Sequence, residues 1–431
     1  MTTLGRKLTK LGMVVFLTCL GHIHGYAMTL EEAVQRTLDS HPEILAARQQ
    51  LASRREEIGQ ARAGYLPDLD LAAGIGREES RSPVTDDEKV RLTRQEASIQ
   101  ARQLVFDGFA TRSEVERQEA RTDSSLHAAR AASENIALRT TEVYLNVLRR
   151  DELRKLALET LYQHQNIHDQ MVLRNRSGVG SKADLDQITA RLALAHSNAI
   201  AAQNNLLDAR TNFFRVIGAL PDVADLSKPS IEQALPGSLE AALQKATDNH
   251  PTLMSANADI DAAEAQYQAS KSTFWPRLQL EAEKNFDQDI GGVEGDDEAL
   301  IVALRLRYNL YNGGGDSARR RQTAHLREEA REIRNNTRRQ VVESARLSWS
   351  AYQAVTEQMK YLELHVKAAL DTKSAYTKQF NIGKRTLLDL LNTENELVEA
   401  KRALVEAGYD KLFAQYRIYN AMGELLDNIG S

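Results

Sequence analysis

The stretch Thr29-Leu30-Glu31-Glu32-Ala33, followed by His41-Pro42, is repeated later in the same chain. At an offset of 209 residues it returns as Ser238-Leu239-Glu240-Ala241-Ala242, followed by His250-Pro251. A match of this length at a fixed offset is the mark of an internal repeat. The 431-residue chain is therefore predicted to be a tandem duplication.

Further matches extend the repeat along the chain. Tyr65-Leu66-Pro67 returns with Trp275 and Pro276 at the same offset. The offset then falls to 205, with Phe106-Asp107-Gly108 matching Tyr311-Asn312-Gly313, Gly178 and Asp184 matching Gly383 and Asp389, and Gly218 matching Gly423. These matches predict a first repeat at 28–220, a linker at 221–237 and a second repeat at 238–431.

Each repeat is predicted to contain the same four elements. A helix begins near Thr29 or Ser238 and runs to the residue before Pro67 or Pro276. A strand hairpin, a long helix and a shorter helix follow, at 68–106, 109–177 and 184–217 in the first repeat and at 277–311, 314–380 and 387–423 in the second. The chain has no proline at 84–220 or 277–431, so helices of this length are allowed.

The helix expected from residue 184 carries a coiled-coil seam. Apolar residues recur at alternating spacings of three and four, namely Leu185, Ile188, Leu192, Ala195, Ala199, Ala202, Leu206, Ala209, Phe213 and Val216. Helices 29–65 and 184–217 together are about as long as helix 109–177. Two short helices are therefore expected to flank one long helix end to end.

The return strand of the second hairpin has one apolar and one polar face. Leu300, Val302, Leu304, Leu306, Tyr308 and Leu310 alternate with residues that include Arg305, Arg307 and Asn309. Four strands cannot close a membrane barrel, for which about eight are needed. An open sheet would leave its edges unpaired, so closure is expected between chains.

Four aromatic residues are predicted to lie at one level, where helices meet strands: Tyr65, Phe106, Trp275 and Tyr311. Aromatic residues concentrate at membrane interfaces. This level is therefore expected at one membrane surface, with ordinary packing at the junction as the alternative.

The sequence resembles the TolC-like outer-membrane channel family over essentially all of the chain after residue 27. The duplication, both His-Pro pairs, the segment 308–314 and the segment 383–389 carry the resemblance. It implies a mainly α fold with a β-barrel part, in which duplicated long helical hairpins form a periplasmic tunnel and four strands per chain complete a 12-stranded barrel in a homotrimer.

The resemblance also implies a function. Such a trimer is an exit duct in the outer-membrane lipid, receiving cargo from an inner-membrane ABC or other transporter through a periplasmic adaptor (membrane fusion) protein. Residues 309–321 are most similar to the type I protein-secretion branch. Gly178 and Gly383, which end the long helices, are expected at the periplasmic tip where the adaptor docks.

A gate at the same tip is implied by the resemblance. The family narrows this mouth with two aspartates, which match Asp389 and Asn392, so only one acid is present. The family's arginine and tyrosine links match Arg385 and Phe380, which has no hydroxyl. One ionic latch from Arg385 to Asp184 is therefore expected, with two unrelated surface charges as the alternative.

Residues 1–27 are predicted to be an export signal. Arg6, Lys7 and Lys10 precede an apolar run, and small residues follow at 25–27. Cleavage would remove three basic residues, lower the net charge from −5 to −8, and remove Cys19, the only cysteine. An uncleaved membrane anchor or a lipid on Cys19 are the alternatives.

Other functional classes have weaker support. His164 and His168 are spaced for a shared metal, but Gln165 stands where a zincin motif needs glutamate. The basic run Arg319-Arg320-Arg321 is interleaved downstream with Glu328 and its neighbours, which indicates a solvated helix face and no nucleic-acid partner. No catalytic constellation occurs, so neither an enzyme nor a cofactor is expected. A periplasmic adaptor and a secreted coiled-coil scaffold remain as alternatives to the duct.

Overall fold

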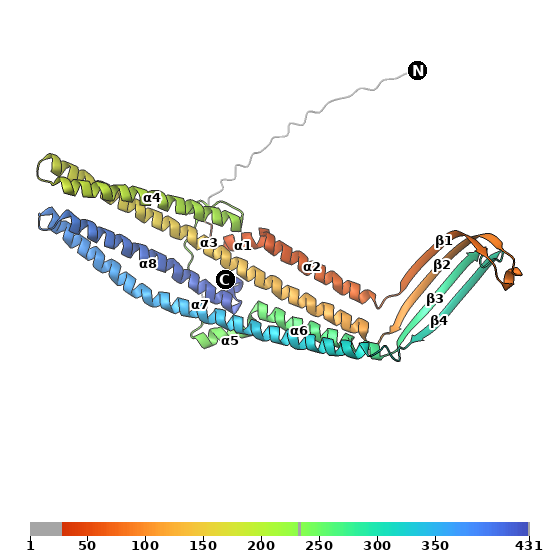
Figure 1. The fold of residues 1–431 in the computed structure, drawn as a ribbon. Helices are drawn as coiled ribbons and strands as arrows, with labels where there is room; N and C mark the ends of the chain where they lie inside the picture. Colours follow the sequence, from red (N-terminus) through yellow and green to blue (C-terminus); the bar gives the residue numbers. More distant parts are fainter. Residues whose placement is uncertain (1–27, 232–233, 430–431) are drawn as a thin grey trace, which may run out of the picture.

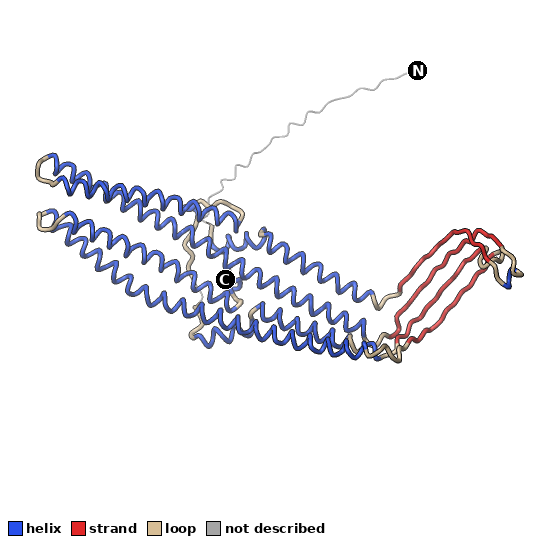
Figure 2. Tube along the Cα trace, in the orientation of Figure 1, coloured by secondary structure: helices blue, strands red, loops and turns tan. Residues whose placement is uncertain are grey.

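A long helical part ends in a four-stranded sheet (Figure 1). The computed structural model describes residues 28–231 and 234–429. Figure 2 shows that all the strands lie at one end and that helices make up the rest of the length. The export signal expected at 1–27, with Cys19, lies outside the described residues.

The two repeats contain matching elements. The first has α1 (Leu30–Ser40), α2 (Pro42–Ala63), β1 (Asp68–Ser80), the 3-10 turn η1 (Pro83–Thr85), β2 (Val90–Phe106), α3 (Ala110–Arg176) and α4 (Lys182–Ile217). The turn η2 (Val223–Asp225) lies in the linker. The second has α5 (Leu239–Asn249), α6 (Pro251–Ala269), η3 (Ser272–Phe274), β3 (Arg277–Gln288), β4 (Asp296–Arg307), α7 (Gly315–Asn381), α8 (Leu387–Met422) and the short helix α9 (Leu425–Ile429).

The expectation of one continuous helix before each hairpin is wrong. His41 is extended, with φ −70° and ψ 127°, and its ring accepts a hydrogen bond from the Glu43 N–H of the next helix. His250 has the same role in the second repeat. The residue before a proline is pushed out of the helical region, while the proline suits a first helical position. The second of these helices also ends early, at Ala269, before η3.

Each long helix has shorter helices along both of its halves (Figure 1). α3 and α7 have 67 residues each, about 100 Å. α4 lies along one half of α3, and α2 lies along the other half, nearer the sheet; α8 and α6 do the same for α7. α6 also packs on α3, where the Ser124 and Ser255 hydroxyl oxygens are 3.0 Å apart. The two repeats therefore share one packed helical body.

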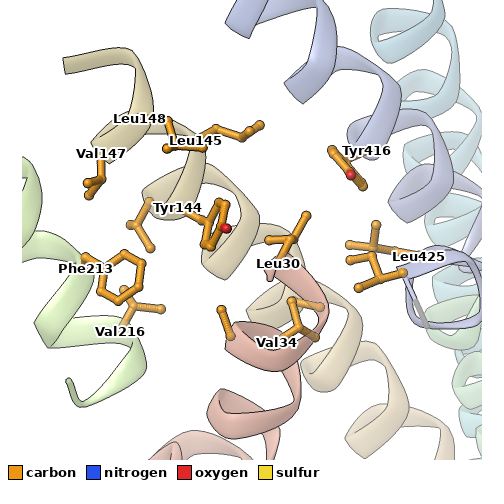
Figure 3. Packing of buried hydrophobic residues seen from close by; sticks show 14 of the residues in the cluster. Leu30, Val34, Tyr144, Leu145, Val147, Leu148, Phe213, Val216, Tyr416 and Leu425 are labelled. Atoms are coloured by element: carbon orange, nitrogen blue, oxygen red, sulfur yellow. The ribbon is translucent and has the colours of Figure 1, made fainter. Parts of the chain in front are cut away.

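The main apolar core lies near the middle of the molecule, where the helices of both repeats meet. Figure 3 shows Leu30 and Val34 of α1, Tyr144 of α3, Phe213 of α4 and Tyr416 of α8 converging there. The rings of Tyr144 and Phe213 have centroids 6.3 Å apart. The Tyr144 hydroxyl lies 2.6 Å from the carbonyl oxygen of Met28 and 2.7 Å from that of Ser227. This core thus also holds the start of α1 and the linker.

A buried carboxylate attaches the short helix α9 to α3. Glu134 accepts hydrogen bonds from the backbone N–H groups of Leu425, at 2.9 Å, and Leu426, at 3.3 Å. Nearby, Arg130 and Asp427 form an ion pair at 2.9 Å. Burial raises the pKa of Glu134 to about 7, against the opposing effect of these hydrogen bonds.

We expect this carboxylate to make the protein less stable as the pH rises. The folded pKa of Glu134 lies above its unfolded value of about 4.5. Below pH 4.5 the free energy of unfolding is therefore at its highest with respect to this group, and it falls by up to about 3 kcal/mol as the pH rises to 7. Glu134→Gln should remove this part of the pH dependence, while the exposed Glu142→Gln on the same helix should not. Thermal unfolding of the native protein and both variants at pH 5 and pH 8 measures the effect. An equal change in unfolding temperature between the two pH values in the native protein and in Glu134→Gln would contradict the prediction.

The four strands form one antiparallel sheet in the order β1-β2-β3-β4. The register shifts between Leu104 and Phe106 in β2. The return strand was expected to continue through Leu310, but β4 ends at Arg307. Beyond it the Asn309 side chain accepts a hydrogen bond from the Tyr311 N–H, at 3.1 Å, which forms a local turn in place of the strand.

Candidate functional site

One face of the sheet is apolar. Directly paired residues share a face, and the register pairs Leu278 with Leu306, Leu280 with Leu304, Ala282 with Val302, Leu69 with Ala101 and Leu71 with Ile99. The side chain of Leu304 is 62% exposed, and its neighbours along β4 are exposed to a similar degree. An uncovered apolar face of this extent needs a partner such as lipid.

The opposite face of the sheet is charged. Arg102 pairs with Asp68 at 3.1 Å and also contacts Asp70, and Arg305 pairs with Glu281. Ala303 lies on this face because its register partner is Glu281. The sheet therefore separates an apolar from an aqueous environment.

Lys284 departs from this pattern, since its register partner is Leu300 on the apolar face. Its ammonium group lies 2.6 Å from a carboxylate oxygen of Glu298 and 4.8 Å from the ring centre of Phe286. A long side chain can keep its stem on an apolar surface while its charge reaches a polar partner near the edge. The alternation of β4 alone could not reveal this residue, which belongs to β3.

The four aromatic residues lie at the helix–strand junctions. The rings of Phe106 and Trp275 meet edge to face, with centroids 6.3 Å apart. Tyr65 is half exposed and Tyr311 is 83% exposed. Phe109, which sequence reasoning missed, extends the group with its ring 5.4 Å from that of Phe106. Its backbone has φ +68°, rare for a bulky residue, and no sequence signal marks it.

Both helical hairpins turn at the end of the molecule far from the sheet (Figure 1). Gly178 and Gly383 each have φ +75°, the left-handed conformation that glycine adopts freely. Their N–H groups bond to the carbonyl oxygens of Asn175 and Phe380, each at 3.0 Å. The turns of the tip therefore favour glycine at these two positions.

An apolar cluster joins the two hairpins just behind these turns. It contains Met171 of α3, Ile188 of α4, Phe380 of α7, and Leu387, Leu390 and Leu391 of α8. The Phe380 side chain is only 7% exposed, and the Arg174 guanidinium lies 4.8 Å from its ring centre. We call these six residues the tip cluster. Phe380 is a packing residue here.

The gating candidates lie close together on one hairpin. Arg385 donates to the side-chain oxygen of Gln379 at 3.0 Å, and its guanidinium is 4.3 Å from the ring centre of Tyr376 and 4.0 Å from Asp389. Among the described residues no ion pair joins Arg385 to Asp184. The structure thus brings Arg385 and Asp389 together but not Arg385 and Asp184, and it adds Tyr376, which sequence reasoning missed.

Asp389 also caps helix α8. Its carboxylate accepts hydrogen bonds from the Thr386 N–H at 3.2 Å and hydroxyl at 2.9 Å. The Thr386 hydroxyl is the largest cause that lowers the pKa of Asp389, followed by the Thr386 N–H. Asn392 is exposed one turn later. A charge that persists to acid pH therefore sits at the tip beside a neutral amide.

The remaining candidates are held by ordinary helix contacts. A ring nitrogen of His164 lies 2.9 Å from the Thr160 carbonyl oxygen, and His168 contacts Asp169. Within the described ranges no group of three His, Cys, Asp or Glu residues is placed to hold a metal ion. The run Arg319-Arg320-Arg321 is exposed near the start of α7.

No helix among residues 28–231 and 234–429 has an apolar run long enough to cross a membrane.

A family model described as outer membrane efflux protein matches the chain twice, at residues 33–219 and 242–424. The chain belongs to the outer membrane efflux protein family. The two matches coincide with the two repeats of this family member, since each begins at α1 or α5 and ends after α4 or α8.

Curated relatives are about one quarter identical to this chain in sequence. The outer membrane efflux protein BepC of Brucella suis is 26% identical over 93% of the chain and 87% of its own length. TolC of Escherichia coli is 24% identical over 93% and 83%. The alkaline protease secretion protein AprF of Pseudomonas aeruginosa is 25% identical over 91% and 84%.

Solved structures show the same fold. The outer-membrane channel OprN superposes with a TM-score of 0.81, at 18% identity, over 92% of this chain and 90% of its own. VceC of Vibrio cholerae superposes with a TM-score of 0.78, also at 18% identity, over 91% and 96%. The predicted TolC-like family and its channel fold are confirmed.

Family membership confirms the expected localisation, the expected class of protein and the expectation that it is not an enzyme. The protein is an outer-membrane protein with a large periplasmic helical part, and it is a channel protein and not an enzyme. The alternatives of a periplasmic adaptor and a secreted scaffold do not fit this family.

Proposed function

We propose that three copies of this chain form the exit duct of a tripartite type I secretion or efflux system. The observation that carries this proposal is the two-faced sheet with open edges. β1 and β4 each pair on one side only within the described chain, and exposed edges of this kind seek a partner strand. Three chains supply twelve strands, enough to close a barrel.

In such a barrel the apolar face, with Leu304, meets lipid and the charged face, with Arg305, lines the lumen. The junction aromatics then lie at the periplasmic surface of the membrane, where Trp and Tyr are favoured. The helices continue the lumen into the periplasm as a tunnel, with Gly178 and Gly383 at its far end.

The geometry and the relatives support a proposal for the partners. An adaptor would dock on the turns of the tip and join the duct to an inner-membrane ABC or other transporter. AprF is named for alkaline protease secretion and PrtF of Dickeya chrysanthemi for protease secretion, whereas BepC is named for efflux. These names, together with residues 309–321, support a role in type I protein secretion.

Detergent extraction of isolated outer membranes tests the proposal. Light scattering of the purified protein should give three chain masses, and planar bilayers should show discrete conductance steps. A monomer without conductance would contradict it.

Bulky side chains at the tip glycines are expected to block export. A Cβ at Gly178 or Gly383 meets no atom within 4 Å, so the cost of Gly178→Leu or Gly383→Leu is the left-handed backbone, about 1–2 kcal/mol. The trimer should survive while secretion is lost. Asn tolerates this conformation, so Gly178→Asn is the matched control and should still export. Loss of the trimer in the Leu variants would show a structural role alone.

Charge changes at the mouth are expected to alter single-channel currents. Arg385→Ala should raise conductance, because it frees the turn of the second hairpin from its contacts with Gln379 and Tyr376. Such a surface contact is worth at most about 1 kcal/mol. Asp389→Ala should weaken block by multivalent cations, since it removes a ring of three carboxylates. Unchanged currents in both variants would exclude this gate.

A further inference from the structure

The two hairpins differ in charge at one equivalent pair of positions. In the first hairpin, Asp68 is paired in register with Arg102. The repeat offsets of 209 and 205 carry these positions to Arg277 and Arg307, which are paired in register on β3 and β4. An acid–base pair in one repeat is thus a pair of arginines in the other.

The arginine pair is not neutralised within the chain. Asp68 and Arg102 form an ion pair at 3.1 Å. Both Arg277 and Arg307 are exposed, and neither forms an ion pair within the described ranges. Like charges directly opposite each other weaken a sheet, and the first hairpin shows that the fold accepts an ion pair here. The fold itself does not explain two arginines.

Both arginines face the lumen side of the sheet. They share the face of Arg305 and Glu281, because residues two apart along a strand lie on one face. β3 begins and β4 ends beside the helical part (Figure 1), so the pair stands where the tunnel would meet the barrel.

Charges on the neighbouring strands leave this level basic. Arg102 and Arg305 are matched by Asp70 and Glu281, which they contact. Asp68 remains as a further acid on these strands, and in the trimer the Asp68 of the next chain lies on the edge strand that β4 would join. Asp107, just beyond β2, is already held by the N–H and hydroxyl of Thr111. Even if every Asp68 were shared with Arg307, one arginine per chain would stay without a partner.

We propose that Arg277 and Arg307 form an oxyanion-binding site at the inner end of the barrel, three copies of which ring the lumen. This inference rests on the proposed trimeric duct. Side chains directly opposite in an antiparallel pair have Cβ atoms about 4.5–5.5 Å apart, so two guanidinium forks can hold one carboxylate or phosphate group between them. The ligand class is therefore an anionic group carried by whatever passes through the lumen.

The site gives the duct two zones of opposite charge. Asp389 places carboxylates at the tip, and the arginine pair places an excess of positive charge at the barrel entrance. An acidic segment of cargo would gain favourable contacts only after it had passed the tip. Such a step would favour its onward movement into the barrel.

Block of single-channel current tests the site. The probes are inorganic pyrophosphate and a short poly-glutamate, added separately on the side of the outer loops so that they reach the barrel without passing the tip. Arg277→Asp recreates the acid–base pair of the first hairpin and should therefore assemble normally. It should lower the affinity of block about tenfold, as should Arg307→Gln, because a charged hydrogen bond is lost.

Arg305→Gln is the matched control. It removes the same charge from the same face of β4, at the position next to Arg307 on that face, where the arginine already pairs with Glu281. Block that weakens only with pyrophosphate assigns a phosphate ligand, and block that weakens only with poly-glutamate assigns a carboxylate. An equal loss in Arg305→Gln, or no loss in Arg277→Asp and Arg307→Gln, would overturn the site. Native protein that forms no pores would contradict the proposed duct instead.

Discussion

Leu304→Arg is expected to abolish membrane insertion and the trimer, while Ala303→Arg should preserve both. Leu304 is paired with Leu280 on the apolar face, and Ala303 is paired with Glu281 on the charged face. An arginine facing lipid near the middle of the bilayer costs roughly 2–4 kcal/mol per chain, and the trimer would carry three. Outer-membrane fractionation and light scattering measure the effect.

The adjacent positions form a matched pair, because both variants add the same side chain to the same strand. Val302→Arg should behave like Leu304→Arg, since Val302 lies on the apolar face opposite Ala282. Assembly of Leu304→Arg together with failure of Ala303→Arg would reverse the assignment of the faces, and with it the lumen position of Arg277 and Arg307.

Phe380→Ala is expected to separate the two hairpins at the tip. Phe380 is buried between helices of both hairpins in the tip cluster, and truncation of a buried Phe costs about 3–5 kcal/mol. The tip should then open more often, which raises single-channel conductance and speeds hydrogen exchange at 171–188 and 380–391. Leu388→Ala is the control, because Leu388 is next to the cluster but 47% exposed.

Hydrogen-exchange protection of the sheet and of the main core should be unchanged in Phe380→Ala. The core contains Tyr144, near the middle of α3, whereas the tip lies at the end of that helix. If exchange is accelerated along the whole of α3 and α7, the residue stabilises the fold generally and has no special part in the mouth. If neither exchange nor conductance changes, the cluster does not hold the mouth closed.

Local signals predicted most of the architecture. The long helices were expected at 109–177 and 314–380 and lie at 110–176 and 315–381, because proline-free stretches end at glycines that adopt φ +75°. The faces of β4 followed from the alternation of leucine and arginine at 304–307. The break before Pro42 was also readable in the sequence, since the residue before a proline avoids the helix.

The candidate site was less predictable, because its contacts join residues far apart in the chain. Phe380 was interpreted as a tyrosine without its hydroxyl, but its role depends on Met171 and Ile188, about two hundred residues earlier. Arg385 was assigned to Asp184, yet Tyr376 and Gln379 on its own hairpin hold it. Such choices between competing partners are made by tertiary packing and leave no local pattern.

The packing of α6 on α3 means that a helix of the second repeat completes the surroundings of a helix of the first. During synthesis and export α3 emerges first, and the face that α6 covers stays bare until residues 251–269 have followed it. The first repeat therefore cannot complete its fold as an independent unit, although the sequence divides there. A chain stopped in the linker would leave the face of α3 around Ser124 uncovered, which makes it a target for periplasmic chaperones and proteases.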